Sequence, residues 1–339
     1  MRNVTAMPLL AALALLLTAC GAEKPETAAY APPEEQRLVI YTSHKEEVYW
    51  PIVQEFEERT GIWVDVTAGG TNELLERVRE ESGAPAADVM FGGGVESLES
   101  YRDCFTPYIC AGAENIQERF CSPDGLWTPF SALPVVLVYN TKLVPAGRIT
   151  GWGDLLSPEL RGRIAFADPA VSGSSFTALV TMLEAVGGEE DETLRRFAEN
   201  LDGRQLEGSG DVVSSVAGGT DLVGVTLEET ALKRMAAGDD IALVYPLDGS
   251  SCVPDGSALI RGAAHEENAR LFLDFTVSRE VQRLLEEQFC RRSVRGDTEP
   301  SLTPLEDLSL VDYDVARASG RRDAVLMSWA FYLGEEGEP

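Results

Sequence analysis

The chain has 339 residues, of which 28 are basic and 56 are acidic, so its formal net charge at pH 7 is −28. This excess of carboxylates excludes binding of nucleic acid or of an anionic lipid face through bulk charge, and any anionic ligand must be captured by local dipoles and neutral donors. The length and the 44% content of hydrophobic residues predict two globular lobes rather than one core.

The first twenty residues have the organisation of an export signal. Arg2 precedes a short apolar run that ends in the sequence LTAC at Cys20. The run is too short for an ordinary membrane-spanning helix, so we expect residues 1–19 to be a signal peptide. The LTAC ending resembles a bacterial lipobox, in which the cysteine is lipidated. We therefore expect Cys20 to anchor an extracytoplasmic protein, in the periplasmic space or on the outer face, through a disordered tether over residues 20–36.

The residues after the tether alternate between strand and helix patterns. Apolar runs and helical spacing predict strands at 37–41, 62–67 and 88–91, and helices at 46–60, at 72–81 and around Leu98. Three repeats of strand, loop and helix are typical of a parallel, doubly wound sheet, in which ligands bind at the carboxyl ends of the strands. The post-strand loops then bring to one edge Ser43, His44, Gly70, Thr71 and Gly93.

Residues 101–125 contain three cysteines and little periodicity, which indicates a surface excursion. A continuous apolar strand at 132–140 is of the kind that crosses between lobes. The alternation then resumes, with strands expected at 163–167, 222–226, 241–245 and 257–260 and helices at 174–186, 191–201, 228–238, 266–275, 279–288 and about 319–331.

One strand-to-helix turn carries an unusual run of hydroxyls: Ser172, Gly173, Ser174 and Ser175. A helix N-terminus has unpaired backbone N–H groups and about half a positive charge, so it can hold an anion without lysine or arginine. Ordinary N-capping by Ser172 or Ser174 is the alternative.

Several stretches resemble bacterial extracellular solute-binding proteins, the receptor subunits of ABC importers. They are YTSHKEEVYWPIVQEFEERTGIWVDV, GWGDLLSPELRGRIAFADPAVSGSSFTALV, the region from DVVSSVAGG through FTVSREVQ, and RRDAVLMSWAFYL. The resemblance covers residues 37–333 and is to the cluster of ferric-ion, sugar-phosphate and 2-aminoethylphosphonate receptors.

The resemblance implies an α/β fold of two doubly wound lobes joined by two hinge strands, the type-2 periplasmic-binding-protein fold. Lobe 1 would contain residues 37–131 and 251–339, and lobe 2 residues 132–250. It also implies a monomer that needs no cofactor, catalyses no reaction and delivers a small anionic organic solute to an ABC permease.

The cluster's ligands differ, and the residues help to choose between them. Ferric receptors of this group carry adjacent tyrosines after the strand that corresponds to 222–226, whereas this chain has Thr226, Leu227, Glu228 and Glu229 there and no tyrosine pair anywhere. Ferric iron prefers several anionic oxygen ligands, so we expect no metal site, and a ferric or other metal receptor is the alternative function.

The resemblance to organophosphate receptors implies roles for individual residues. Phosphate oxygens would be bound by Ser43, Ser172, Ser174 and Ser175, with Gly173 in the same helix start. We expect Gly70, Thr71 and Gly93 to line the other lobe, where the glycines let the backbone approach the ligand closely. His44 is expected to lie exposed at its turn, or else, if protonated, to add charge to the phosphate end. The rest of the solute, with hydroxyls or an ammonium group, would meet Asp211, Thr226 and Glu228. Glu229 is expected to be a helix N-terminal acid that touches no ligand.

The sequence also bears on two other classes of function, an enzyme and a sensor. A hydrolase would need a nucleophile with a base in reach, but the side chains of Ser43 and His44 diverge and no GxSxG motif is present. A sensor that closes on its ligand and docks on a membrane receptor has the same sequence signals as a transport receptor.

Five cysteines follow Cys20. An extracytoplasmic setting permits disulfides, so Cys104, Cys110 and Cys121 could supply one bond, and Cys252 and Cys290 another. Only two histidines and no CxxC spacing argue against a Cys/His metal site.

Overall fold

The computed structural model describes residues 32–298 and 302–334. The predicted signal peptide, the lipidation site Cys20 and most of the tether lie outside the described residues. The chain divides into residues 1–35 and 36–339, and the first unit is described only from Pro32, with a 3-10 turn, η2, at Glu34–Gln36. All that follows concerns the second unit.

Three parallel strands form the first part of the sheet, in the order β2-β1-β3: β1 (Arg37–Thr42), β2 (Trp63–Ala68) and β3 (Val89–Gly94). Each is followed by a helix: α1 (Glu46–Thr60), α2 (Thr71–Glu80) and α3 (Val95–Ser100). Helix α1 ends at Gly61, whose φ of 71° is the left-handed conformation that favours glycine. The predicted order of these six elements is confirmed, with ends that differ by three residues at most.

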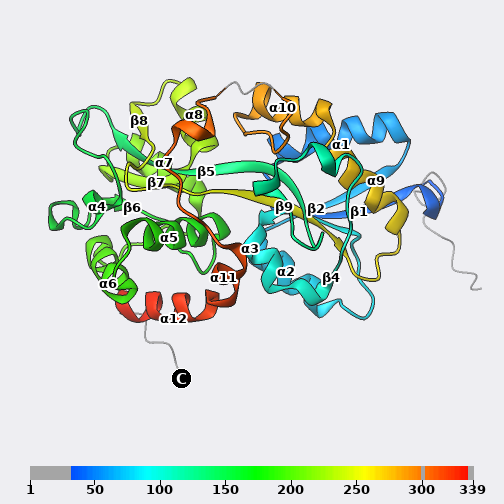
Figure 1. Ribbon diagram of the computed structural model, residues 1–339, viewed down its shortest axis with the longest axis horizontal. Coiled ribbons are helices and arrows are strands. Elements are labelled where there is room, and N and C mark those ends of the chain that lie inside the picture. Colours follow the sequence, from blue (N-terminus) through cyan, green and yellow to red (C-terminus); the bar gives the residue numbers. More distant parts are fainter. Residues whose placement is uncertain (1–31, 299–301, 335–339) are drawn as a thin grey trace, which may run out of the picture. The chain divides into compact units, whose positions relative to one another are not determined.

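Two long antiparallel strands connect the lobes (Figure 1): β5 (Thr128–Asn140) and β9 (Cys252–Ile260). The first half of β5 pairs with β9, and its second half pairs with β7 (Val223–Leu227) and β8 (Ile241–Val244). Strand β9 in turn pairs antiparallel with β3. These are the two expected hinge strands, and they make the sheet mixed rather than purely parallel.

The second lobe is built around β6 (Ile164–Ala165), which runs parallel to β7. Its helices are α4 (Trp152–Leu155), α5 (Gly173–Val186), α6 (Glu190–Leu201), α7 (Ser209–Ala217) and α8 (Glu228–Ala236). The chain then returns to the first lobe, which is completed by the short strand β4 (Phe105–Thr106) beside β9 and by helices α9 (Glu266–Thr276) and α10 (Arg279–Phe289). The excursion at 101–125 carries the 3-10 turns η3 (Arg102–Cys104), η4 (Ala113–Asn115) and η5 (Glu118–Phe120).

Each lobe has its own aromatic core. In the first, Phe91 packs edge to face against both Phe130 and Phe272, at ring-centroid distances of 4.9 and 5.1 Å. In the second, the fully buried Phe166 packs in the same manner against Phe197 at 5.1 Å. Phe176, on α5, belongs to this second core and so is not available to stack on a ligand.

The C-terminal helices α11 (Val315–Gly320) and α12 (Arg322–Leu333) pack against helices of different lobes, although Ala318 of α11 contributes to the same core as Trp329 of α12. Helix α11 packs against α3, whereas α12 packs against α6 (Figure 1). The ring of Trp329, on α12, lies 5.8 Å from that of Phe166. The expected lobe 1 extended to residue 339, but α12 is held by the core of the second lobe. We therefore propose that the two lobes have the bounds predicted from the sequence, except that α12 belongs to lobe 2.

All five cysteines after Cys20 carry free thiols in the structure. The two disulfides that the sequence permitted are therefore not formed. Burial raises the pKa of the Cys110 thiol to about 11 and that of Cys252 to about 12, so both are protonated and poorly nucleophilic at neutral pH.

Candidate functional site: the cleft between the lobes

A cleft of about 310 Å³ lies where six helices begin. Its lining includes the N-terminal ends of α1, α2 and α3 from the first lobe and of α5, α7 and α8 from the second. The volume is at the small end of the range for ligand pockets, which fits a small solute. The convergence follows largely from the topology, because five of these helices begin beyond the carboxyl end of a strand, whereas α7 follows α6.

Eight of the twelve ligand-binding residues predicted from the sequence line this cleft: Ser43, His44, Gly70, Thr71, Gly93, Ser172, Gly173 and Ser174. They come from four separate stretches of the chain, and the two lobes contribute to the same space. The loops that follow the strands therefore lie around one cleft, as the sequence predicted.

The start of α5 lies against hydroxyl groups of the first lobe. The Ser172 hydroxyl accepts a hydrogen bond from the backbone N–H of Ser175 at 3.3 Å, which is the capping role, and lies 3.1 Å from the Ser174 hydroxyl. A Cβ built at Gly173 would lie 3.7 Å from Oγ of Ser97 and 4.0 Å from Oγ1 of Thr71. Capping and cleft lining are thus both present at this turn.

Four predicted ligand-binding residues lie elsewhere. Ser175 and Thr226 are buried and Asp211 is exposed, and none of the three lines the cleft. Glu228 is also buried: its carboxylate accepts hydrogen bonds from Nε and Nη2 of Arg292, both at 2.7 Å, and from the hydroxyl of Tyr245. Asp211 and Glu228 were predicted to contact hydroxyls or an ammonium group of the solute. Instead, Asp211 is exposed to solvent, and the charge of Glu228 is neutralised by Arg292.

His44 is buried, contrary to the expectation that it is exposed at the turn. Its ring packs 4.6 Å from that of Phe91 and 4.9 Å from that of Phe130. Burial, helped by the nearby guanidinium of Arg291, holds the pKa of His44 well below its ordinary value of 6.5. The imidazole is therefore neutral at pH 7 and adds no positive charge to the cleft.

Three buried charged residues at the cleft were not predicted from the sequence as ligand-binding residues. Arg291 is buried, and its Nη1 lies 2.7 Å from Oδ2 of Asp255 and 3.1 Å from Oγ of Ser131. Its Nη2 lies 3.4 Å from Oε1 of Glu229, the residue that was expected to touch no ligand. Arg291, Asp255 and Glu229 all line the cleft.

The six helix starts differ in the charge that they carry. The first turns of α1, α2, α3, α7 and α8 contain the acidic residues Glu46, Glu47, Glu73, Glu96, Asp211, Glu228 and Glu229. The first turn of α5 contains none. An acid in the first turn compensates the positive end of the helix dipole, so α5 alone among the six has no such compensation from its own first turn.

Contacts across the cleft hold the two lobes together. Nδ2 of Asn72, on α2, donates to the carbonyl of Ala170 at 2.6 Å, and Nζ of Lys233, on α8, lies 3.0 Å from Oε1 of Glu47 on α1. Deeper in, the Thr177 hydroxyl of α5 contacts the buried carboxyl of Glu96 on α3. In the described conformation, residues of both lobes therefore line the same cleft.

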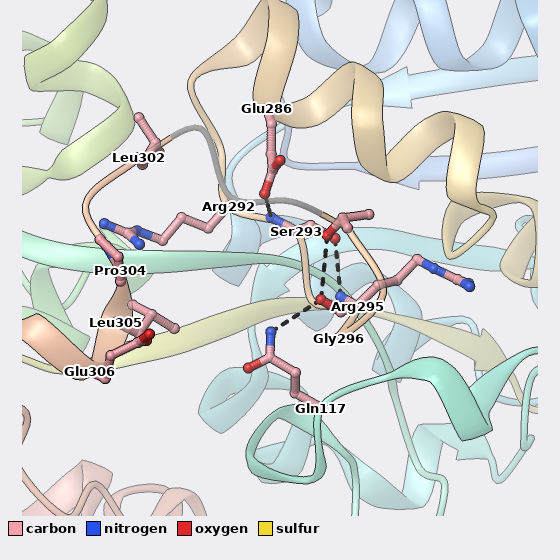
Figure 2. Close-up of a pocket in the computed structure, with 11 residues that line it drawn as sticks. Gln117, Glu286, Arg292, Ser293, Arg295, Gly296, Leu302, Pro304, Leu305 and Glu306 are labelled. Atoms are coloured by element: carbon pink, nitrogen blue, oxygen red, sulfur yellow. Dashed lines mark hydrogen bonds between the residues drawn. The ribbon is translucent and has the colours of Figure 1, made fainter.

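A second pocket, of about 270 Å³, lies beside the segment after α10 (Figure 2). Its two guanidinium groups are already used, because Arg292 pairs with Glu228 and Arg295 pairs with Asp297 at 2.6 Å. Figure 2 also shows Gln117 bonded to the backbone of Arg295, through its Nε2 at 3.2 Å. This polar pocket has no unpaired cation to attract an anion.

Within residues 32–298 and 302–334, no cluster of three or more His, Cys, Asp or Glu side chains could hold a metal ion. None of the tyrosines in that part of the chain lines the cleft. Nor does any helix there have both the length and the apolar character needed to cross a membrane.

The sequence of residues 87–318 matches the family described as bacterial extracellular solute-binding protein. The chain belongs to this family. The Fe(3+)-binding periplasmic protein of Serratia marcescens is 26% identical over 90% of this chain and 93% of that protein. A Salmonella typhimurium protein provisionally named as 2-aminoethylphosphonate-binding is 24% identical over 73% of this chain and 74% of that protein.

Solved structures show the same fold for this solute-binding protein. The periplasmic binding protein AfuA from Actinobacillus pleuropneumoniae, with exogenous fructose-6-phosphate bound, superposes with a TM-score of 0.81 at 24% identity, covering 88% of this chain and 98% of that one. The ferric binding protein from Campylobacter jejuni gives a TM-score of 0.77 at 21% identity, covering 87% and 99%. The expected type-2 periplasmic-binding-protein fold is confirmed, and the protein is a solute-binding receptor of an ABC importer.

Proposed function

We propose that this receptor binds a small phosphorylated or phosphonate organic solute, with its anionic group at the start of α5. The observation that carries the proposal is the absence of acidic residues from the first turn of α5, in contrast to the five other helices that begin at the cleft. Hydroxyls of Ser43, Thr71 and Ser174 line the same space, so neutral donors and one uncompensated dipole are available to a dianion.

The alternative is a ferric receptor, which is favoured by the names of some relatives, such as the Serratia protein. The side chains of the cleft argue against it. No tyrosine among the described residues lines the cleft, and its two buried carboxylates, Asp255 and Glu229, are both paired with Arg291. Hard Fe³⁺ would have to displace these ion pairs to gain anionic oxygen ligands.

A ligand screen separates the two functions. Thermal unfolding of the purified protein is measured with inorganic phosphate, a hexose 6-phosphate, 2-aminoethylphosphonate and Fe³⁺. A ligand at a hundredfold excess over its Kd adds about 2.7 kcal/mol to the free energy of unfolding. We expect stabilisation by at least one organic phosphate or phosphonate. Stabilisation by Fe³⁺ alone would establish the alternative.

A single substitution tests the location of the anionic group. Ser174→Glu places a carboxylate at the start of α5 and is expected to abolish binding of every phosphate ligand while the melting temperature without ligand stays nearly unchanged. Ser214→Glu introduces the same group on α7, at an exposed position away from the cleft, and is the matched control. Unchanged affinity in Ser174→Glu would remove α5 from the site.

We also propose that Cys20 is lipidated and tethers the receptor to the membrane. The support is the LTAC ending of a short apolar N-terminal run. Cys20→Ser should release the protein from the membrane fraction, and mass spectrometry of the mature N-terminus should find a lipidated cysteine in the unaltered chain. A free N-terminus elsewhere would contradict the proposal.

A further inference from the structure

Glu229 is the carboxylate of α8 that lines the cleft, and two cations already hold it. Nζ of Lys233, one turn further along the same helix, lies 3.0 Å from its Oε2, and Nη2 of Arg291 lies 3.4 Å from its Oε1. Although burial alone would raise the pKa of Glu229, Arg291 and Lys233 bring it below the ordinary value, so the carboxylate is ionised at pH 7.

Glu229 and Asp255 together carry as much charge as the two cations that contact them, although Lys233 also lies 3.0 Å from the exposed Glu47. Arg291 and Lys233 supply two positive charges, and Glu229 and Asp255 supply two negative ones. His44, whose Nδ1 lies 3.7 Å from Asp255, is neutral. The remaining charged side chains that line the cleft, Lys45 and Glu207, are exposed and of opposite sign. Both buried carboxylates of the cleft, Asp255 and Glu229, are therefore paired with a cation.

We propose that Lys233 determines the class of solute: it supplies the cation beside Glu229, so the cleft accepts an uncharged, hydroxyl-bearing group there and rejects an ammonium group. A hydroxyl can donate to Glu229 and accept from the guanidinium of Arg291, whereas an ammonium group can only donate and would add a third positive charge. The inference rests on the proposed function, in which α5 holds the anionic end. Since Lys233 acts through Glu229, it is a positioning residue.

Isothermal titration with two probes tests the proposal, because a hexose 6-phosphate and 2-aminoethylphosphonate share an anionic end and differ in the other group. We expect the unaltered protein to bind the hexose 6-phosphate at least tenfold more tightly. Lys233→Met keeps an unbranched side chain but removes the ammonium, together with its position 5.9 Å from the centre of the Phe289 ring. Glu229 is then left with Arg291, which it shares with Asp255, as its remaining cation. The ratio of the two affinities should then shift by about tenfold toward 2-aminoethylphosphonate.

Two control variants isolate this effect. Glu47→Gln removes the other carboxylate that Lys233 contacts, at 3.0 Å, and leaves the pair with Glu229 in place. Lys142→Met removes a lysine paired with Asp240, and neither of these residues lines the cleft. Neither control should change the ratio. If Lys233→Met does not fold, Lys233→Gln, which also lacks the charge, should give the same shift.

The outcomes separate the two proposals. Tighter binding of 2-aminoethylphosphonate by the unaltered protein, or an unchanged ratio in the folded Lys233 variant, would overturn the role of Lys233 while phosphate binding at α5 stands. Failure of inorganic phosphate and both organic probes to bind the unaltered protein would instead overturn the proposed function, and the inference with it.

Discussion

Arg292 and Glu228 form a two-point ion pair beneath the cleft, with Nε and Nη2 of the guanidinium each 2.7 Å from a carboxylate oxygen. Glu228 is 1% exposed, so removal of its charge would leave Arg292 buried without a counter-charge. We expect Glu228→Gln to lower the free energy of unfolding by about 3 kcal/mol or more. Chemical denaturation measures this loss. If Glu228→Gln keeps its full stability but no longer binds ligand, Glu228 is a ligand-binding residue.

Gly92 is required by the position of His44. It has a φ of 96°, and a Cβ built there would lie 2.7 Å from Nε2 of the imidazole. Gly238 has a similar φ of 92° with nothing within 4 Å of such a Cβ, which makes it a matched control for backbone strain alone. Gly92→Ala should destabilise the protein by about 2 kcal/mol more than Gly238→Ala in denaturant unfolding. Equal losses would show that His44 moves aside without cost.

Burial of a neutral His44 makes stability depend on pH. The folded-state pKa lies well below 6.5, so below pH 6.5 the unfolded chain binds a proton that the folded chain does not. Stability from this group is therefore complete above pH 6.5 and falls as the pH decreases toward the folded-state pKa, by up to about 1.4 kcal/mol per pH unit. His44→Gln should lack this dependence when unfolding curves are compared from pH 7 to 5. Parallel pH profiles would contradict the burial of a neutral imidazole.

The free thiols differ in accessibility. Cys121 is exposed, whereas Cys104 and Cys110 are buried and their raised pKa values further slow alkylation. In a Cys20→Ser chain, iodoacetamide should label five cysteines in denaturant without reductant, and Cys121 before Cys104 and Cys110 in the native protein. Intact-mass spectrometry counts the labels. Fewer than five in denaturant would reveal a disulfide.

Much of the fold could be predicted because the helices and strands have clear periodicity and explicit ends. Gly61 ends α1, and the hydroxyl-rich turn at Ser172–Ser175 begins α5, so sequence and structure agree there. Strand β9 was predicted from residue 257 only, because Pro254, Asp255 and Gly256 disfavour a strand. Its pairing with β5 overrides that local preference, which no single segment reveals.

The two halves of the candidate site differ in how far the sequence determines them. A loop that follows a strand of a doubly wound sheet must lie at the edge where the ligand binds. For this reason eight residues that line the cleft could be predicted from the sequence. The choice between Glu228 and Glu229 depends on the rotation of α8, since consecutive helical residues point about 100° apart. Arg291 meets Asp255 and Glu229 only through the tertiary fold, being 36 and 62 residues away. The available signal was the concentration of Arg291, Arg292 and Arg295 in an acidic chain.

The position of α12 has a consequence for how the protein folds. Trp329 completes the core of the second lobe by packing on Phe166 and Phe197, which lie more than 130 residues earlier in the chain. During synthesis or export, this core remains open until α12 has emerged, so apolar surface of the second lobe stays accessible to chaperones and to aggregation for that whole interval. Loss of α12 would leave that apolar surface permanently uncovered. A chain without α12 would then be recognised by quality-control proteases, because its second lobe has an incomplete core.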